Sequence, residues 1–354
     1  MERIRMITAP DRQAYEKAMD NFNHIAKPLH SLGRFEEMIG KIAGMTGSPQ
    51  VCLDKKCVVV MCADNGVVKE GIAQSDSDVT GIVAEAMADG DGNINNLCRQ
   101  YGADLLVVDA GMKHTSSRQE IISIKRKNGT EDFLKKPAMS VEDCRAVISE
   151  AISLVKRLRD SGYQILAVGE MGIGNTTTSS AIASVILHKP PAAVTGKGAG
   201  LDDDALRHKI QVIEQAIALH RPDREKPIDL LSALGGFDIA GMTGLFLGGA
   251  IYQIPVVIDG LIASVAAALA KMISPLAVEY MLPSHVSQEP AAKWLLQYLG
   301  LEPVITAGMC LGEGTGAVML FPLLDGVLRI YGSEHSFEQL HLPQYEEKKE
   351  VGAK

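Results

Sequence analysis

Glu313 is the residue best placed to do chemistry, because it is a single carboxylate with a glycine on either side. It lies in the segment AGMCLGEGTGA (residues 307–317), which has four glycines between Gly308 and Gly316. Glycine adopts backbone angles that other residues avoid, so such a segment turns tightly and approaches another molecule closely. Glu313 is therefore either a solvated loop residue or an acid/base group at a ligand, and the segment alone leaves both interpretations open.

A second carboxylate, Glu170, lies in the segment GEMGIGNTTT (residues 169–178), which follows an apolar run and opens a helix. Asn175 or Thr176 can cap that helix, and its free N–H groups suit a phosphate. Thr177 occupies the third glycine position of the dinucleotide fingerprint, and no G-K-[ST] follows, so this is neither that fingerprint nor a Walker A loop. A phosphate site and a tight turn without a ligand both fit the segment.

A third glycine cluster, TGKGAG (residues 195–200), leads into a helix through three aspartates at residues 202–204. Aspartates stabilise a helix N-terminus but repel a phosphate placed on it. Any phosphate contact should therefore come from the glycine loop and from a nearby cation. Lys197 and Lys209 are the available cations, although an ordinary solvated lysine is the alternative for each.

Composition excludes several classes of protein. The 354 residues are 46% hydrophobic and 22% charged, with a formal net charge of −8. Sequence-independent nucleic-acid binding needs a basic surface, and stacking on bases needs aromatic residues, which make up 5% of this chain. We therefore expect no nucleic-acid partner.

Metal and membrane signals are also missing from the sequence. The six cysteines form no C-x-x-C pair, and the nine histidines show no ligand spacing, so we expect reduced thiols and no metal. The charged N-terminus has no apolar run behind it. The apolar stretch 241–258 contains Pro255, which favours a buried helix followed by a strand over a membrane span. We expect a cytoplasmic protein without a membrane partner.

Short apolar runs alternate with helical stretches along the chain. This alternation predicts βαβ units and an α/β fold with an open or doubly wound parallel sheet. Residues 117–136 are polar and mixed in charge, and we expect an exposed hairpin or loop there. The expected strands are 58–63, 105–108, 165–168, 255–258 and 304–307, and the main expected helices are 79–98, 144–159, 176–187, 204–219 and 261–273.

An acidic or glycine turn follows each expected strand. Ligands of such sheets bind outside the carboxyl ends of the strands. Asp64, Asp109, Glu170, Asp259 and Glu313 should therefore converge on one edge of the sheet. Carboxylates in glycine loops beside a phosphate-type turn suit displacement at a phosphorylated sugar with acid/base help.

Six motifs, in order along about residues 20 to 330, carry a resemblance to a known family. They are SLGR (31–34), ADNG (63–66), GEMGIGNT (169–176), GKGAGLD (196–202), VIDG (257–260) and LGEG (311–314). Together they resemble the nicotinate-nucleotide–dimethylbenzimidazole phosphoribosyltransferase family of cobamide biosynthesis.

The resemblance implies a Rossmann-like parallel sheet covered by helices, with a small helical domain built from the two chain ends. On this basis residues 1–45 and about 285–354 form the small domain, and about 46–284 form the large α/β domain. The loop 307–317 would pack at their junction. The family also implies a homodimer.

The implied reaction transfers phosphoribose from nicotinate mononucleotide to a lower-ligand base such as dimethylbenzimidazole, and it needs no cofactor. Glu313 matches the general base that removes the azole proton, and Glu170 matches a second carboxylate of the site. The positions around the phosphoribosyl group are Gly172, Gly174, Asn175, Gly198 and Lys209; Thr176 and Asp259 are further substrate contacts, and Ser75 and Leu311 match the base pocket.

The chain departs from the family pattern near the expected base pocket. Residues 75–78 read SDSD where the family usually has a proline-containing segment, and Val83 occupies the position of a glutamine. An aliphatic side chain there removes a donor and an acceptor, which leaves base preference open. A purine, another benzimidazole and a phenolic base are the alternatives to dimethylbenzimidazole.

Two other classes of function fit parts of the pattern. Another nucleotide-handling α/β enzyme, such as a dehydrogenase or a nucleoside hydrolase, would need a complete glycine fingerprint or a carboxylate cluster around calcium. A non-catalytic carrier of bases or nucleotides would bind the same ligands without turnover. Release of nicotinate in the presence of a base separates the transferase from both.

Overall fold

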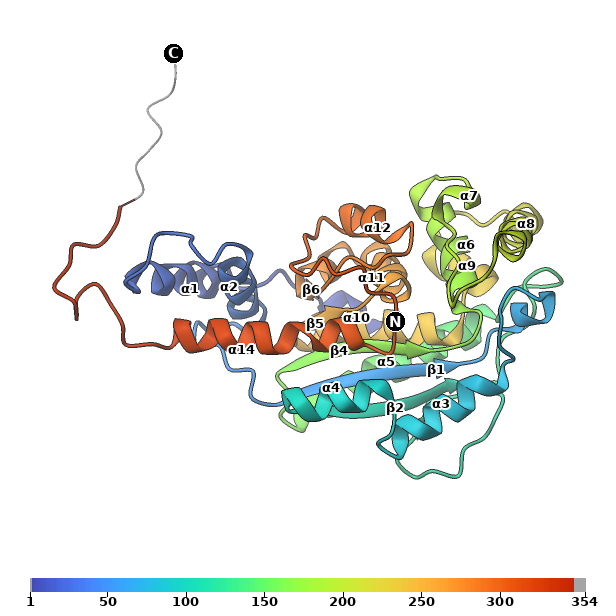
Figure 1. Cartoon of the computed structure of the whole chain (residues 1–354), viewed down its shortest axis with the longest axis horizontal. Helices are drawn as coiled ribbons and strands as arrows, with labels where there is room; N and C mark the ends of the chain where they lie inside the picture. The colour runs from blue at the N-terminus through green and yellow to red at the C-terminus, as the bar shows by residue number, and fades with distance from the viewer. Residues whose placement is uncertain (1, 347–354) are drawn as a thin grey trace, which may run out of the picture.

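A six-stranded parallel sheet forms the centre of the computed structural model, which describes residues 2–346 (Figure 1). The strand order is β3-β2-β1-β4-β5-β6, with every neighbouring pair parallel. Apolar runs without polar alternation suit strands covered on both faces, and all of β1 is buried. The strands are β1 (Lys56–Ala63), β2 (Ala103–Gly111), β3 (Ile122–Ser123), β4 (Ile165–Met171), β5 (Val256–Ile258) and β6 (Met281–Pro283).

The strand order changes direction between β1 and β4, which are neighbours at the centre of the sheet. In an open parallel sheet this point leaves a crevice beyond the carboxyl ends of the strands, where ligands bind. The predicted α/β fold with a parallel sheet is confirmed, and its topology places the ends of β1 and β4 at that crevice.

Helices cover both faces of the sheet. Figure 1 shows α3 and α4 on one side of the sheet and α5 and α10 behind it, while α6 to α9 gather at one end of the molecule. The helices are α1 (Arg12–His24), α2 (Arg34–Thr46), α3 (Asp78–Ala88), α4 (Asn93–Tyr101), α5 (Val141–Asp160), α6 (Asn175–Leu187), α7 (Pro191–Val194), α8 (Asp203–His220), α9 (Pro227–Leu234), α10 (Phe237–Tyr252), α11 (Leu261–Ile273), α12 (Ala292–Leu299), α13 (Thr315–Val318) and α14 (Leu320–Tyr331), with 3-10 turns η1 (Glu2–Met6), η2 (Gly66–Glu70) and η3 (Pro275–Tyr280).

Helix α10 is buried along nearly its whole length and packs closely against α5. Glycine makes this approach possible, because a Cβ at Gly244 would lie 2.5 Å from the carbonyl oxygen of Ile148. The sequence prediction of a buried helix followed by a strand in residues 241–258 is confirmed by α10 and β5. Among residues 2–346, no helix combines the length and the apolar character needed to cross a membrane.

The two chain ends meet beside the sheet. Helices α1, α2 and α14 lie together at the end of the molecule opposite α6 to α9 (Figure 1). The Tyr331 hydroxyl joins them, donating to the carbonyl of Pro49 at 2.7 Å and accepting from Asn21 at 2.9 Å. Ile25 and Ser336 form an isolated antiparallel bridge. Residues 347–354 of the expected small domain lie outside the described residues.

Three local expectations are wrong. The helix expected over 79–98 is two helices, because the chain turns at Gly90 with φ of 90° before α4 begins. Residues 304–307 form no strand and make only one bridge, from Ile305 to His285. The strand that pairs with β5 at this edge of the sheet is β6, which ends in a proline. The loop expected over 117–136 contains the short edge strand β3.

Candidate active site

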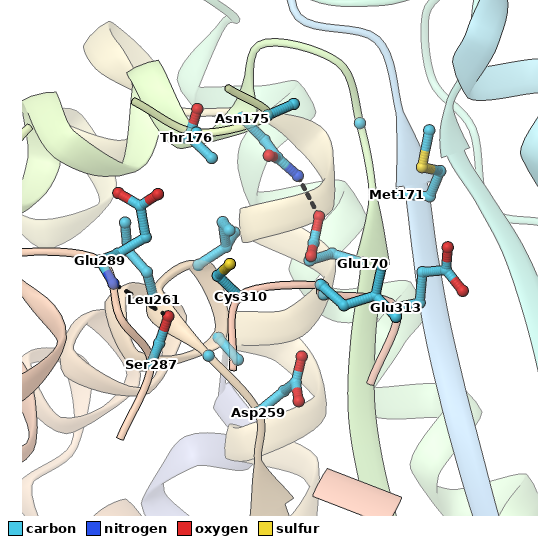
Figure 2. A pocket seen from close by; sticks show the side chains of 18 of the residues that line it. Glu170, Met171, Asn175, Thr176, Asp259, Leu261, Ser287, Glu289, Cys310 and Glu313 are labelled. Carbon is cyan, nitrogen blue, oxygen red and sulfur yellow. Dashed lines mark hydrogen bonds between the residues drawn. The ribbon is translucent and has the colours of Figure 1, made fainter. Parts of the chain in front are cut away.

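Glu170 is the next-to-last residue of β4, so it lies at the carboxyl end of a central strand. Its side chain is only 8% exposed. The chain then turns at Gly174 with φ of 91°, and α6 begins at Asn175. The Asn175 side-chain amide donates a hydrogen bond to Glu170 Oε2 (Figure 2). One short segment therefore holds a buried carboxyl group and its donor.

The pKa of the Glu170 carboxyl group is raised far above its ordinary value. Burial penalises the charged form and raises its pKa to about 8, and the negative charges of Asp238, Asp259 and Glu313 act in the same direction. The hydrogen bond from Asn175 lowers the pKa but does not outweigh burial. A carboxyl group that titrates near the working pH can both give and take a proton.

The glycines around Glu313 let its loop lie directly on β4. A Cβ at Gly169 would lie 2.5 Å from the carbonyl oxygen of Glu313, so no side chain fits between them. Glu313 itself has φ of 61°, a left-handed conformation that is uncommon outside glycine. Backbone held in this conformation clusters at functional sites, which agrees with a role for Glu313 in the cavity.

The Glu313 carboxylate is held at the N-terminus of α4. Its Oε1 accepts from the Asn93 side-chain amide at 3.4 Å, and its Oε2 accepts from the backbone N–H of Ile94 at 3.3 Å. A helix N-terminus stabilises negative charge. In Figure 2 this carboxylate points away from that of Glu170, so the two acids have different partners.

Asp259 follows β5 and is 3% exposed. Its Oδ1 accepts from the backbone N–H of Ala317 at 2.9 Å, which ties β5 to the helix after the Glu313 loop. Burial raises the Asp259 pKa, and the nearby His285 imidazole acts against that rise. Gly316 leaves room for this imidazole, because a Cβ there would overlap its Nδ1. Asp259 and His285 form a second pair of ionisable groups in the same cavity.

These groups line a cavity of about 240 Å³ at the carboxyl ends of the central strands. Figure 2 shows its wall, with Glu170, Asp259 and Glu313 contributed by different segments. Leu311 is 58% exposed and also lines this cavity. The predicted residues that line it are Glu170, Gly172, Asn175, Thr176, Gly198, Asp259, Leu311 and Glu313.

A second cavity, of about 100 Å³, contains the buried Lys209. Its Nζ donates to Thr176 Oγ1 at 2.9 Å and to the carbonyl of Gly196 at 3.2 Å. Burial lowers the pKa of this lysine to about 8. Gly198 turns the neighbouring loop with φ of 54°. Ser75 also lines this cavity, where the chain offers a cation and a glycine loop for an anion.

The two cavities are neighbours with a common wall, because both are lined by Gly172, Ile173, Asn175, Thr176 and Ala199. A ligand that spans them would place one end at the carboxyl groups and the other at Lys209. Of the other predicted residues, Gly174 lines the lysine cavity. Val83 lines neither cavity and packs half-buried against the hydrophobic core.

Asp64 and Asp109 lie at the predicted carboxyl edge of the sheet, but outside both cavities. Asp64 accepts from the backbone N–H of Lys113 at 2.6 Å, and Asp109 accepts from that of Met112 at 2.7 Å. Both are buried and line neither cavity. They fix the chain after β2, so they have a structural role at this edge of the sheet.

Sequence reasoning missed four residues near the predicted ones. His285, Glu289 and Cys310 line the carboxylate cavity, and Asp238 is buried beside Asn175. His285 follows the unpredicted strand β6, and Asp238 opens an otherwise apolar helix. The sequence signal for Asp238 is its position at the start of an apolar run. A carboxyl group that is buried there needs a polar partner.

Comparisons with known proteins place the chain in a family. A family model described as a phosphoribosyltransferase matches residues 7–341. A protein of Clostridium acetobutylicum named nicotinate-nucleotide–dimethylbenzimidazole phosphoribosyltransferase is 41% identical, over 97% of each chain. A protein of the same name from Acetivibrio thermocellus is 42% identical, over 94% of this chain and 96% of that protein.

A solved structure shares the fold. The crystal structure of CobT from Thermus thermophilus is similar with a TM-score of 0.89 and 30% sequence identity, covering 94% of this chain and 100% of that one.

Proposed function

Because this chain is a member of the phosphoribosyltransferase family whose model it matches, we propose that it transfers the phosphoribosyl group of nicotinate mononucleotide to an aromatic base. The relatives' names carry nicotinate nucleotide and dimethylbenzimidazole. The products are nicotinate and a nucleotide of the α-ribazole phosphate type. The observation that carries this proposal is that a carboxylate cavity lies beside a lysine cavity and shares a wall with it.

The charges of the two cavities orient the substrate. A phosphate accepts from Lys209 and from N–H groups of the glycine loops, whereas ionised carboxylates in the other cavity repel it. The ribose then spans the shared wall at Asn175 and Thr176 and brings C1′ to Glu170, Asp259 and Glu313.

The chemical step is a displacement at C1′. A ring nitrogen of the base forms the new bond while the bond from C1′ to nicotinate breaks, and the electron pair of that bond neutralises the pyridinium nitrogen. Glu313 rotates from the N-terminus of α4 and takes the azole proton. Ionised carboxylates stabilise the positive charge that develops at C1′. Glu170 enters this step as the second acid/base group.

The identity of the base is set by the rim of the carboxylate cavity. Leu311 offers an exposed apolar surface there, which suits the face of an aromatic ring. Dimethylbenzimidazole is the base that the relatives' names give. A purine, another benzimidazole and a phenolic base are the competing acceptors.

The protein acts as a homodimer in the cytoplasm under this proposal. Support for the dimer is the exposure of large apolar side chains such as Ile82, at 65%. The six free cysteines agree with a reducing compartment. Light scattering on the eluted protein should give twice the mass of one chain, and the mass of a single chain contradicts the dimer.

The reaction is tested by incubating the protein with nicotinate mononucleotide, with and without dimethylbenzimidazole. We expect nicotinate release only when the base is present, in equal amount to a new nucleotide identified by mass spectrometry. Release without the base would make the protein a hydrolase. Binding of both compounds without release would make it a carrier.

A further inference from the structure

A buried carboxyl group outside both cavities, that of Asp238, lies behind Glu170. Asp238 is the second residue of α10 and is 0% exposed. Its Oδ1 accepts from the backbone N–H of Ile239 at 2.9 Å, which is an ordinary contact at a helix start. This contact leaves Oδ2 unexplained, and Oδ2 faces the active site.

The Asn175 amide connects the two acids. Its Nδ2 carries two hydrogens and donates one to Asp238 Oδ2, at 3.1 Å, and the other to Glu170 Oε2. Both carboxyl groups are buried, so two negative charges on one neutral amide would be costly. A single proton on the pair relieves that cost.

Three glycines make the space that this arrangement needs. A Cβ at Gly172 would lie 2.7 Å from Asp238 Oδ2, and a Cβ at Gly236 would overlap Asp238 Oδ1. Gly312 does the same on the cavity side, where a Cβ would lie 2.5 Å from Glu170 Oε1. The Oε1 atom therefore faces the loop of Glu313 without a side chain in between.

We propose that Asp238 is a positioning residue for Glu170: through the Asn175 amide it holds Oε2 as an acceptor and keeps the acidic proton on Oε1, facing the reacting atoms. Glu170 then presents a neutral O–H to the reacting atoms as a hydrogen-bond donor and keeps its proton, while Glu313 is the base. This inference rests on the proposed function, because the reacting atoms are those of the transferred phosphoribosyl group.

The charges around the pair agree with this placement of the proton. The charges that act on Glu170 are those of Asp238 on α10, Asp259 after β5 and Glu313 before α13, and the buried Cys62 thiol on β1 lies close to the pair. Burial raises the Glu170 pKa to about 8 and the Asp238 pKa to about 6. Asp238 has the additional backbone donor, so it is the member that ionises first.

The substitution that tests the proposal is Asp238→Asn, which removes one charge and keeps the size of the side chain. Its matched control is Asp109→Asn, another buried aspartate at the carboxyl edge of the sheet that lines neither cavity. The readout is the infrared carbonyl band of the protonated carboxyl group in the unliganded full chain, followed with pH and assigned by its loss in Glu170→Gln.

We expect Asp238→Asn to lower the titration midpoint of the Glu170 band by about one pH unit, a tenfold change in proton affinity, because a like charge is removed. Asp109→Asn should keep the wild-type midpoint. Asn175→Ala should move the midpoint upward, since it removes the donor to the ionised form. These opposite shifts distinguish the proposed linkage from a general loss of packing.

The alkaline limb of kcat/KM should move by the same amount and in the same direction in Asp238→Asn. An unchanged infrared midpoint, with only a lower melting temperature, would reduce Asp238 to a helix cap and overturn the proposal. If Asp238→Asn does not fold, the upward shift in Asn175→Ala decides, and its absence overturns the proposal. The infrared shifts are measured without turnover. If they occur in a protein that releases no nicotinate, the proposed function is wrong but the linkage between Asp238 and Glu170 stands.

Discussion

The carboxylate cavity and the lysine cavity share one wall and differ in every charged group. The first is lined by four carboxyl groups and His285, and the second is lined by Lys197 and Lys209. Burial acts on both, raising the pKa of Glu170 and lowering that of Lys209, each to about 8. One physical cause therefore prepares proton transfer at one end and leaves a cation at the other.

This difference indicates how a site that has neither a dinucleotide fingerprint nor a Walker A loop can orient a phosphorylated substrate. Under the proposed function, ionised carboxylates keep the phosphate out of the first cavity, and Lys209 with its glycine loop accepts it in the second. That proposal separates chemistry from binding by charge between two neighbouring cavities. Substitutions at the two ends should have different kinetic signatures, and the following predictions test that separation.

The largest effect should follow Glu313→Gln. Loss of a general base typically costs ~100- to 10,000-fold in turnover, so kcat at saturating substrates should fall by that amount with little change in KM. Glutamine still fits at the N-terminus of α4, so the melting temperature should stay close to that of the wild type. Turnover near that of the wild type would remove Glu313 from the role.

The second-largest effect should be a change in the free energy of unfolding, caused by Glu170→Gln. Burial raises the Glu170 pKa from 4.5 to about 8, so between these pH values the folded chain binds more protons than the unfolded chain. Stability from this group therefore falls as pH rises through that window. Relative to the wild type, Glu170→Gln should gain about 4 kcal/mol between pH ~4.5 and ~8, measured by denaturant unfolding. A constant difference across the window would mean that Glu170 is ionised throughout.

A smaller effect should follow Lys209→Met, at the binding end. It removes a charge-assisted contact to the phosphate, so KM for nicotinate mononucleotide should rise by roughly 10- to 100-fold with a smaller change in kcat. Lys226→Met is the matched control, because Lys226 is exposed, lines neither cavity and is paired with Asp223 at 3.4 Å. An equal loss in both variants would show that only net charge matters.

The smallest effect should follow Val83→Gln. Val83 packs against the core and lines neither cavity, so the product ratio in a competition between two bases should change less than about threefold. Mass spectrometry of the products measures this ratio. A larger shift would place Val83 in contact with the base.

The sequence predicts the central strands well and the edge of the sheet poorly. Strands β1, β2, β4 and β5 coincide with β-branched runs, whereas β3 has two residues and β6 ends in Pro283, so neither carries a periodic pattern. Residues 304–307 have the composition of a strand, but they form no strand. Their only bridge joins Ile305 to His285, just after the edge strand β6. Short strands depend on tertiary packing that local composition does not report.

The site divides in the same way. Glu170 and Glu313 were found because each lies in a glycine turn, which is a local signal. Asp238 and His285 reach the site through helix packing and through a strand of three residues, so no local pattern marks them. Asp64 and Asp109 have the same local pattern as Glu170 and Glu313, but their carboxylates accept hydrogen bonds from backbone N–H groups.

The most direct test of the separation compares two donors, nicotinate mononucleotide and its dephosphorylated riboside, in the wild type, Lys209→Met and Glu313→Gln. We predict that the wild type prefers the phosphorylated donor in kcat/KM and that Lys209→Met loses most of this preference. Glu313→Gln should be slowed by the same factor with both donors and so keep the preference. If Lys209→Met loses the same factor with both donors, the phosphate does not bind at Lys209 and the proposed orientation is wrong.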